Sequence, residues 1–481
     1  MLATVDHAIR DRPSASVGGA LLGALGALAL LRLVSLGLYP LMDKTEARYA
    51  DIARRMVEAN DWVTPWIGNG VPFWGKPPLS FWTTAASLEI FGINEFAARL
   101  PHYLLGGLVI WLVWQFARRS SMRAAWHGAS LLAGSVLFLV SGGAVMTDMA
   151  LTLGTTLVMV GFWRCFQTDG HRRADPLLLA LGVVIGLLAK GPVSIVLWGL
   201  PLAAWALITG NVCAAWQRIA WARIAILAVV VALPWYLLAE ARTPGFLHYF
   251  IVGEHWQRFT VPGWTGDLYG GAHHAPRGTI WLYAIAAIMP WPLIAPFLRR
   301  TRVRGGEDLA AAGERTYLLA WVLAPCLVFT LAANIIWTYV LPGLPALAVL
   351  AGYWTSMCQD QARVERCLVV GLAACAVAIC ALIVLAQSTT YLDSKSAKAV
   401  LSEYHAGTST EPLYFLGHVP FSGSFYSAGT AKSVATVGEL PPGRPVYLVL
   451  EEEAWKALSK EQLARIQFKA YRGGRVLARI D

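Results

Sequence analysis

The sequence has few charged residues for its length. Of its 481 residues, 14% are Asp, Glu, Lys or Arg and 57% are hydrophobic, and the mean hydropathy is +0.53. A soluble domain carries about 25% charged residues, so this shortage excludes an ordinary soluble domain and indicates a polytopic membrane protein. The apolar residues also run continuously instead of alternating with polar ones, which excludes a transmembrane β-barrel.

The N-terminal stretch MLATVDHAIRDRPSASVGG lacks a small-residue cleavage site after a short apolar core. We therefore expect the first apolar run to be a retained signal anchor. Runs of roughly 18 or more mostly apolar residues, long enough to cross a bilayer as helices, recur along the chain. We expect an α-helical membrane protein with about eleven spans, and up to thirteen, at about 17–38, 100–117, 124–141, 145–166, 176–191, 193–209, 222–239, 279–298, 316–333, 337–355 and 367–387.

The loops predict the orientation of these spans. With the N-terminus and its Arg10 and Arg12 in the cytoplasm, the even-numbered spans lead to loops that each contain several arginines: ARRSSMR, CFQTDGHRR, AAWQRIAWAR, FLRRTRVRGGEDLAAAGER and CQDQARVER. The positive-inside rule requires this distribution. The net charge of +10 is therefore largely a topology signal, and we expect no nucleic-acid partner.

This orientation places residues 39–99, residues 240–278 and the tail after about 388 outside the cytoplasm. The seven cysteines, at 165, 213, 326, 358, 367, 375 and 380, all lie elsewhere. Such a distribution is typical of a protein without disulfides in an oxidising compartment. The chain thus divides into a membrane domain, 1–387, and a C-terminal domain, 388–481.

The tail differs in composition from the membrane domain. EPLYFLG, PVYLVLEEE, FKAYRGG and RVLARI have the pattern of short strands, and EEEAWKALSKEQLARI that of an amphipathic helix. We expect a small periplasmic α/β domain, which has no recognisable nucleotide-binding loop.

The first external segment has two helical patterns. TEARYADIARRMVEAND spaces its apolar residues as in a helix on the membrane surface. PLSFWTTAASLEIFG is more hydrophobic and ends at a glycine, a helix stop signal. VPFWGKPP joins the two patterns and holds Lys76 in a rigid, aromatic frame. We expect two interfacial helices that roof the mouth of the bundle.

Residues 45–101 closely resemble the first external loop of bacterial GT-C glycosyltransferases such as the aminoarabinose transferases of lipid A, and more distantly protein O-mannosyltransferases. The family pattern has an acidic pair before R-Y-A, where this chain has T-E; the further matching pieces, in order, are I-A-R-x-M, K-P-P and F-A-A-R-L-P. LAKGP, PGFLHYFIVGEHWQRF and WTYVLPGLPALAVL extend the resemblance over most of the membrane domain. The resemblance implies transfer of a sugar from a polyprenyl-phosphate donor outside the cytoplasmic membrane.

Such a donor needs cations near its phosphate, because negative charge builds up on the leaving phosphate. Lys76 is a compact cation able to contact it, and Arg48 could add a bidentate contact. Tyr49, beside Arg48 in the R-Y motif, is a further candidate for binding the donor phosphate or substrate. The alternatives are that Lys76 reaches lipid headgroups and that Arg48 pairs with Asp51 or Asp43.

An acceptor hydroxyl needs a carboxylate as general base or orienting group. Where the family has a D-E pair, this chain has Thr45-Glu46, with Asp43 nearby, so either Glu46 or Asp43 takes that role. These two carboxylates are three positions apart and could share one face of a helix. Asp148, at the outer edge of the fourth span, is a third candidate, since buried ionisable groups face polar cavities. It could instead cap a broken helix, and an acceptor that is itself a phosphate needs a base less.

Further residues are candidates for binding the donor phosphate or sugar. The resemblance implies phosphate contacts for His255 and Arg258. The remaining candidates are Lys190, with an interfacial anchor as its alternative, and Tyr339, with an aromatic-belt role as its alternative. Arg277 in HHAPRG is a candidate phosphate or sugar ligand, and the alternative for this segment is a zinc site held by its paired histidines. Gly75 occupies a position where the related enzymes often have an acidic residue. That acidic residue, together with a loop histidine, is a candidate metal-ligand pair in those enzymes. Glu254 with His248 is too small a ligand set, so we predict no metal and no cofactor.

The combined interpretation is an inverting glycosyltransferase of the inner membrane with an active site at the periplasmic face. Its expected partners are a polyprenyl-phosphate sugar, membrane lipids, and a lipid A-like or other envelope glycan acceptor. The alternative is a transporter or flippase of a lipid-linked sugar. A transporter would place its polar groups near the midplane and often in repeated halves, whereas the polar residues here gather on one side and no repeat is visible.

Overall fold

The computed structural model describes residues 17–68, 70–168, 174–271, 273–298, 312–388, 391–406 and 411–481. The N-terminal arginines that support the predicted orientation lie outside these ranges, as do parts of two predicted cytoplasmic loops, residues 169–173 and 299–311.

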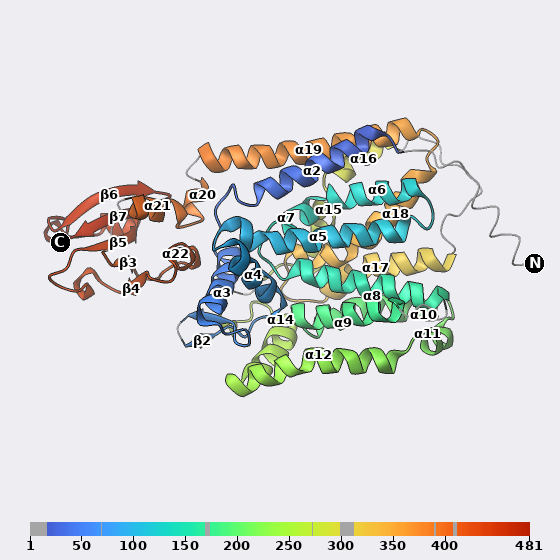
Figure 1. Cartoon of the computed structure of the whole chain (residues 1–481), viewed down its shortest axis with the longest axis horizontal. Helices are drawn as coiled ribbons and strands as arrows, with labels where there is room; N and C mark the ends of the chain where they lie inside the picture. Colours follow the sequence, from blue (N-terminus) through green and yellow to red (C-terminus); the bar gives the residue numbers. More distant parts are fainter. Residues whose placement is uncertain are drawn as a thin grey trace, which may run out of the picture.

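Long helices lie side by side in a bundle, with the described N-terminal end at one end of it and the C-terminal domain at the other (Figure 1). The bundle helices are α2 (Gly19–Ser35), α5 (Glu95–Ala117), α6 (Met122–Ala133), α7 (Val136–Ser141), α8 (Asp148–Thr168), α9 (Ala174–Lys190), α10 (Val193–Ile208), α12 (Trp221–Arg242), α15 (Thr279–Ala287), α16 (Trp291–Leu298), α17 (Ala312–Thr330), α18 (Leu344–Met357) and α19 (Gln361–Ser388). Each predicted span falls on one of these helices or on a consecutive pair.

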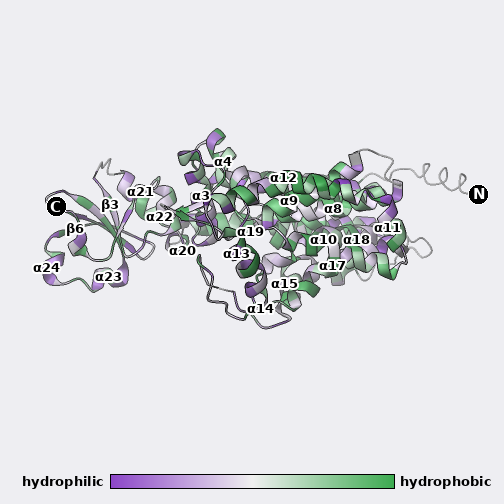
Figure 2. Cartoon of the chain, turned by 90° about the horizontal axis from the view of Figure 1, so that it is seen from below, coloured by the Kyte–Doolittle hydropathy of each residue, from purple (hydrophilic) through white to green (hydrophobic). Residues whose placement is uncertain are grey.

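Five helical segments in the described ranges are long and apolar enough to cross a membrane: α5, α8, α12, Trp337–Met357 and α19. The pair α15 and α16, bent by 70° at its break, adds a sixth if it forms one span, and α2 and α10 are shorter apolar helices. Figure 2 shows hydrophobic residues concentrated along the bundle and hydrophilic ones at its two ends. The chain is therefore a multi-pass membrane protein.

The close packing of α8 against α9 positions two of the charged residues. A Cβ atom at Gly154 would lie 2.7 Å from the backbone nitrogen of Gly186, so only glycine permits this approach. The two helices are antiparallel neighbours in sequence. The first residue of α8, Asp148, and the last of α9, Lys190, therefore meet at the same end of the bundle.

Two helices, α3 (Thr45–Ala59) and α4 (Leu79–Phe91), cover this end of the bundle, with α3 running across it (Figure 1). The short antiparallel strands β1 (Trp66–Gly68) and β2 (Val71–Pro72) lie between them. The sequence predicts α3 as a surface helix with an exposed polar face, but Asp51 and Arg54 are 1% and 0% exposed. The C-terminal domain covers that face, which the helical pattern alone could not indicate.

The second external segment contains α13 (Phe246–His248), the π-helix η1 (Tyr249–Gln257) and α14 (Arg258–Thr260). Single π-helical turns occur frequently at functional sites. The 3-10 helix η2 (Trp337–Gly343) begins the penultimate bundle segment at the same end, and α11 (Val212–Arg218) lies at the opposite end.

The C-terminal domain contains a five-stranded sheet of order β4-β3-β5-β7-β6. Its strands are β3 (Leu413–Leu416), β4 (Lys432–Val434), β5 (Val446–Glu451), β6 (Ile466–Arg472) and β7 (Arg475–Ile480), and its helices are α20 (Tyr391–Ser394), α21 (Lys398–Ala406), α22 (Phe421–Tyr426), η3 (Val437–Glu439), α23 (Glu452–Lys456) and α24 (Lys460–Leu463). Strand β3 is parallel to β4 and β5, whereas β7 is antiparallel to β5 and β6.

The single helix predicted over 451–466 is wrong, because the segment forms α23 and α24 with a break between them. Ser459 is extended and caps α24 in a reciprocal capping box with Gln462. Its side chain competes with helix continuation, so the helical pattern stops there.

Candidate functional site

The meeting of α8 and α9 places an ion pair at the mouth of the bundle. The Lys190 ammonium donates to Asp148 Oδ1 over 2.7 Å, and both side chains are largely buried. The Lys190 nitrogen also lies 5.0 Å from the centre of the Tyr339 ring, at the start of the penultimate segment. Three predicted site residues from distant parts of the chain are thus brought together.

A second charged group forms where the K-P-P segment faces η1. The Lys76 ammonium donates to Glu254 Oε2 over 2.8 Å, and Arg258 donates to Glu254 Oε1 over 3.0 Å. Arg258 also contacts Asp267 Oδ2 at 3.2 Å. The Glu254 side chain is 4% exposed, whereas that of Lys76 is 21% exposed, so the lysine faces open space beside a buried partner.

These contacts determine the charge state of the group. Burial raises the pKa of Glu254, but the charges of Lys76 and Arg258 outweigh burial and hold this pKa at about 2. Burial lowers the pKa of Lys76, and the adjacent Glu254 carboxylate more than compensates, so that the net shift is upward. Burial lowers the pKa of His255. At neutral pH the positive charge of the group therefore resides on lysine and arginine.

These residues line a cavity of about 390 Å³ beneath α3, which we call the central cavity. Five cations and three carboxylates line it: Lys44, Arg48, Lys76, Lys190, Arg258, Asp148, Glu254 and Asp267. The excess of positive charge suits an anionic ligand, because such clefts concentrate their counter-ions. Tyr49 and Tyr339, both predicted, also line this cavity.

A smaller cavity of about 90 Å³, the inner pocket, continues from the central cavity into the bundle. The two share Lys76, Lys190, Glu254, Arg258 and Tyr339 as lining residues. The rest of its lining is mainly apolar and includes Leu197 of α10 and Phe329 of α17, together with the predicted His255. Cations therefore stand where a polar cavity meets an apolar pocket.

Arg48 lies in the wall of the central cavity. Its guanidinium packs over the rings of Tyr49 and Phe73, with distances to the ring centres of 5.3 and 5.5 Å, and donates to the carbonyl oxygen of Tyr269. Its buried Nε has no hydrogen-bond partner among the described residues. The alternative ion pair with Asp51 is not formed, since Arg54 and Arg55 occupy that carboxylate.

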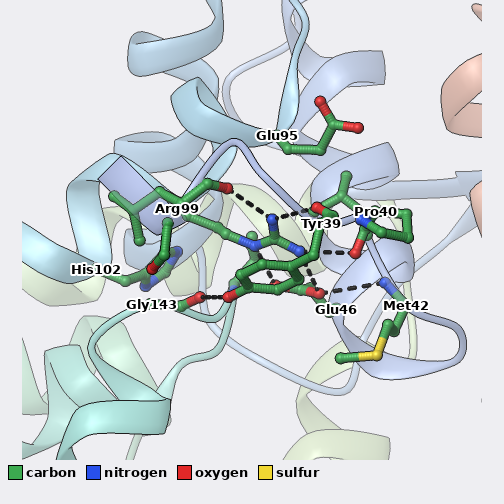
Figure 3. A network of polar contacts seen from close by, with 12 residues as sticks. Tyr39, Pro40, Met42, Glu46, Glu95, Arg99, His102 and Gly143 are labelled. Atoms are coloured by element: carbon green, nitrogen blue, oxygen red, sulfur yellow. Dashed lines mark hydrogen bonds and ion pairs between the residues drawn. The ribbon is translucent and has the colours of Figure 1, made fainter. Parts of the chain in front are cut away.

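Three predicted site residues lie away from both cavities. The structure buries Glu46 in a polar network in which Arg99 donates to both of its carboxylate oxygens, at 2.8 and 2.9 Å (Figure 3). Arg99 also donates to the backbone carbonyl oxygens of the segment before α3. This arrangement makes Glu46 an anchor for the first turn of α3, and Thr45, not Glu46, lines the central cavity.

Asp43 faces the C-terminal domain. One of its oxygens accepts from the Ser422 backbone nitrogen over 2.9 Å, and the other accepts from the Ser422 hydroxyl. The predicted helical spacing with Glu46 does not apply, because α3 begins at Thr45 and Asp43 precedes it. Arg277 is exposed and lines neither cavity.

The donor set for a metal is not assembled in the described ranges, where no three His, Cys, Asp or Glu side chains converge. His255 Nδ1 lies 2.7 Å from the Phe250 carbonyl oxygen, and its Nε2 lies 3.1 Å from that of Lys190. Because burial lowers the pKa of His255, the ring is neutral and has one N–H, which donates to one of these two carbonyl oxygens. These contacts join η1 to the end of α9, so His255 positions Lys190.

Sequence reasoning missed several residues of the site. Glu254 was considered only as a metal ligand, although its spacing from Arg258 is that of an i,i+4 helical ion pair. Asp267 and Tyr269 lie in a loop without a periodic pattern, and no local pattern singles out Lys44, just before α3. Their placement depends on contacts between distant segments.

Comparison with known proteins gives matches that agree with this geometry. Residues 28–250 match the family model described as dolichyl-phosphate-mannose-protein mannosyltransferase. An undecaprenyl phosphate-alpha-4-amino-4-deoxy-L-arabinose arabinosyl transferase of Aeromonas hydrophila is 30% identical over 325 residues, which cover 65% of this chain and 55% of the relative. A transferase of the same description from Pseudomonas fluorescens is 30% identical over 358 residues, which cover 70% of this chain and 58% of the relative. The chain thus matches little more than half the length of these relatives.

Among solved structures, the crystal structure of ArnT from Cupriavidus metallidurans bound to undecaprenyl phosphate superposes with a TM-score of 0.78. The match has 20% sequence identity and covers 96% of this chain and 98% of that chain. It therefore extends over the C-terminal domain, where the sequence resemblance weakens. The chain has the GT-C fold of ArnT and, as its motifs predicted, resembles the bacterial aminoarabinose transferases and more distantly the protein mannosyltransferases.

Proposed function

We propose that the chain is a glycosyltransferase that transfers a sugar from a polyprenyl-phosphate donor to a lipid or glycan acceptor at the periplasmic face of the inner membrane. The observation that carries this proposal is the position of Lys76, Lys190 and Arg258 at the junction of the apolar inner pocket and the polar central cavity. A polyprenyl phosphate has the same division, with an apolar chain joined to an anionic head.

The proposed reaction is a single inverting displacement. An acceptor oxygen attacks the anomeric carbon, the bond from that carbon to the phosphate oxygen breaks, and polyprenyl phosphate leaves with the electron pair. The lysine and arginine side chains stabilise the negative charge that develops on the leaving phosphate. In this scheme the phosphate competes with Glu254 for Lys76 and Arg258.

Asp148 is the carboxylate that we assign to the acceptor. Its Oδ1 accepts from Lys190, and its Oδ2 makes no hydrogen bond with any described residue although the side chain lines the cavity. That oxygen can accept the proton of an acceptor hydroxyl or orient an acceptor that is already ionised. Lys190, which donates to Oδ1, fixes the direction of the carboxylate.

The orientation proposed from the loops also agrees with the arrangement of the molecule. Helix α3 and the meeting ends of α8 and α9, which supply residues of the central cavity, lie at the same end of the bundle as the C-terminal domain, opposite α11 and the described N-terminal end (Figure 1). We propose that the N-terminal end of α2 faces the cytoplasm and that the C-terminal domain lies in the periplasm.

The test uses the full chain in lipid nanodiscs with radiolabelled undecaprenyl-phosphate sugars, 4-amino-4-deoxy-arabinose first and hexoses in comparison, and an extract of envelope glycolipids. We expect label to pass to an acceptor, and Lys76→Ala to lower the rate by about 100-fold or more. Lys432→Ala, at an exposed lysine of β4, is the matched control and should leave the rate unchanged. Flipping of the intact donor across the membrane without transfer would favour the transporter alternative instead.

A further inference from the structure

A third cavity separates the C-terminal domain from the loops above the bundle. This domain cleft has a volume of about 850 Å³, more than twice that of the central cavity. Trp74 and Tyr269 line it on the membrane-domain side, and His418 and Phe421 line it on the side of the C-terminal domain. The transfer reaction described above uses none of the residues from the C-terminal side.

The domain cleft adjoins the central cavity. Lys44, Tyr269 and Gly270 line both spaces. The guanidinium of Arg48, in the wall of the central cavity, lies 5.8 Å from the centre of the Phe421 ring, which lines the cleft. A molecule held in the cleft can therefore extend one end into the central cavity, toward Asp148.

Apart from Lys44, the charged side chains that line the cleft have partners within the protein. Asp43 accepts two hydrogen bonds from Ser422, and Arg475 pairs with Glu451 at 3.1 Å. Lys44 is exposed, and its side-chain ammonium makes no hydrogen bond or ion pair with any residue in the described ranges. It immediately precedes α3, whose positive N-terminal end adds to the field at the same place.

The remaining surface of the cleft suits a carbohydrate. Trp74, Tyr269 and Phe421 present aromatic side chains, and a few polar groups stand among them, as in sites that orient a ligand by sparse polar contacts. The phosphate-facing residues Lys76, Lys190 and Arg258 do not line the cleft, so it is separate from the part of the site that suits the donor.

We propose that the domain cleft binds the acceptor of the transfer reaction, that the acceptor is a glycan or glycolipid headgroup with an anionic group contacted by Lys44, and that the C-terminal domain selects it through Phe421 and His418. The inference rests on the proposed transferase function. It gives the C-terminal domain a role in acceptor specificity, while the membrane domain supplies the donor side.

The experiment measures binding, which does not require turnover. The full chain in nanodiscs is titrated with three probes: undecaprenyl phosphate, a diphosphorylated disaccharide glycolipid, and the same glycolipid without phosphates. Lys44→Ala should weaken binding of the phosphorylated glycolipid by about tenfold or more, as expected for loss of one charged contact. It should change binding of undecaprenyl phosphate and of the dephosphorylated glycolipid by less than about threefold.

Further variants distinguish the acceptor side from the donor side. Phe421→Ala, with Phe421→Leu as a milder change should the first lose its fold, is expected to weaken both glycolipids and leave undecaprenyl phosphate unaffected. Lys76→Ala should show the reverse pattern, and Lys432→Ala, at an exposed lysine of the same domain, should match the wild type. Thermal unfolding of each variant checks its folding.

The proposal is overturned if the wild type binds neither glycolipid, or if the cleft variants lose undecaprenyl phosphate as strongly as the phosphorylated glycolipid. Failure of the proposed function has a different signature. In that case the wild type binds both classes of probe, the cleft variants lose the glycolipid alone, and no sugar is transferred from any donor.

Discussion

At the scale of single residues, Glu254 affects both the stability of the fold and the binding of the donor phosphate. Its carboxylate lies between Lys76 and Arg258, and its pKa in the folded state is about 2 against an ordinary value of 4.5. A carboxyl whose folded pKa is depressed stabilises the fold above its unfolded pKa, and this contribution is lost as the pH falls from about 4.5 toward 2.

Glu254→Gln is therefore expected to lower the free energy of unfolding at pH 7 by roughly 3 kcal/mol. Because wild-type Glu254 becomes protonated in acid, the difference between the two proteins should shrink as the pH falls from 4.5 to 2.5. Thermal unfolding across this range measures it. The same variant should bind undecaprenyl phosphate more tightly at pH 7, because the phosphate no longer competes with a carboxylate. A constant stability difference at all pH values would contradict the role assigned to the charge.

Gly75 is a second position where a single added carbon atom, the Cβ of any other residue, would disturb the packing. An added Cβ would lie 2.8 Å from Cζ of Phe73 and within 3.4 Å of two further atoms of the ring. That ring packs against Tyr49, Phe81 and Tyr269, with ring centres 4.6 to 5.8 Å apart, so it has little room to move. The glycine thus belongs to the packing that holds the K-P-P segment in place.

We expect Gly75→Ala to cost about 1 to 3 kcal/mol of stability, as overpacking does, and to reduce transfer by displacing Lys76. Gly199→Ala is the matched control, because an added Cβ there meets nothing within 4 Å. Thermal unfolding and the transfer rate, measured on both variants, test this. Equal stability of the two variants would show that Phe73 can yield.

The network around Arg99 acts at the scale of elements. Arg99 belongs to α5, Glu46 to α3, and three accepting carbonyl oxygens to the segment 36–40 that leads from α2 (Figure 3). The Arg99 side chain is fully buried, so loss of its partner leaves a charge without compensation. One guanidinium therefore fixes the place where α3 starts, and with it Thr45 and Arg48.

Glu46→Gln should lower the free energy of unfolding by about 3 to 5 kcal/mol, as expected when one partner of a buried ion pair is removed. The exposed pair of Arg242 with Asp61 is the control, and Arg242→Ala should cost about 1 kcal/mol or less. If Glu46 anchors α3, the conservative Glu46→Asp should partly restore stability and transfer together. Full stability of Glu46→Gln with abolished transfer would instead return Glu46 to a catalytic role.

Elements with strong local patterns could be predicted from the sequence, whereas their partners could not. Apolar runs predicted the bundle helices, and the K-P-P motif singled out Lys76, because hydropathy and backbone rigidity are local properties. The carboxylates were less predictable. Glu46 and Asp43 face residues 53 and 379 positions away in the chain, Arg99 and Ser422, and nothing in the local spacing indicates those contacts. Lys76 lines the central cavity, and its partner Glu254 lies 178 positions away in the chain, which no local pattern indicates.

At the scale of the whole molecule, α3 lies between the two parts of the chain. Its first turn lines the central cavity, and its outer face packs under α22 of the C-terminal domain. Arg55 donates to the Ser424 hydroxyl over 2.9 Å, and Lys398 pairs with Glu95. The position of the domain cleft relative to the central cavity therefore depends on how firmly α22 is docked.

Tyr426 of α22 provides the test of this docking. Its hydroxyl donates to Glu95 Oε1 over 2.9 Å and accepts from the Leu41 backbone nitrogen over 2.7 Å, so Tyr426→Phe leaves both groups without this partner. We expect a loss of about 1 to 3 kcal/mol in stability and faster hydrogen exchange in the amides of α3. The KM for the acceptor should rise more than the KM for the donor, because the domain cleft lies on the side of the displaced C-terminal domain.

Tyr414→Phe, at a hydroxyl of β3 without a hydrogen bond to any described residue, is the control and should change none of these quantities. Unchanged exchange in α3 together with equal rises in both KM values would show that the C-terminal domain acts without contacting the cavity through α3.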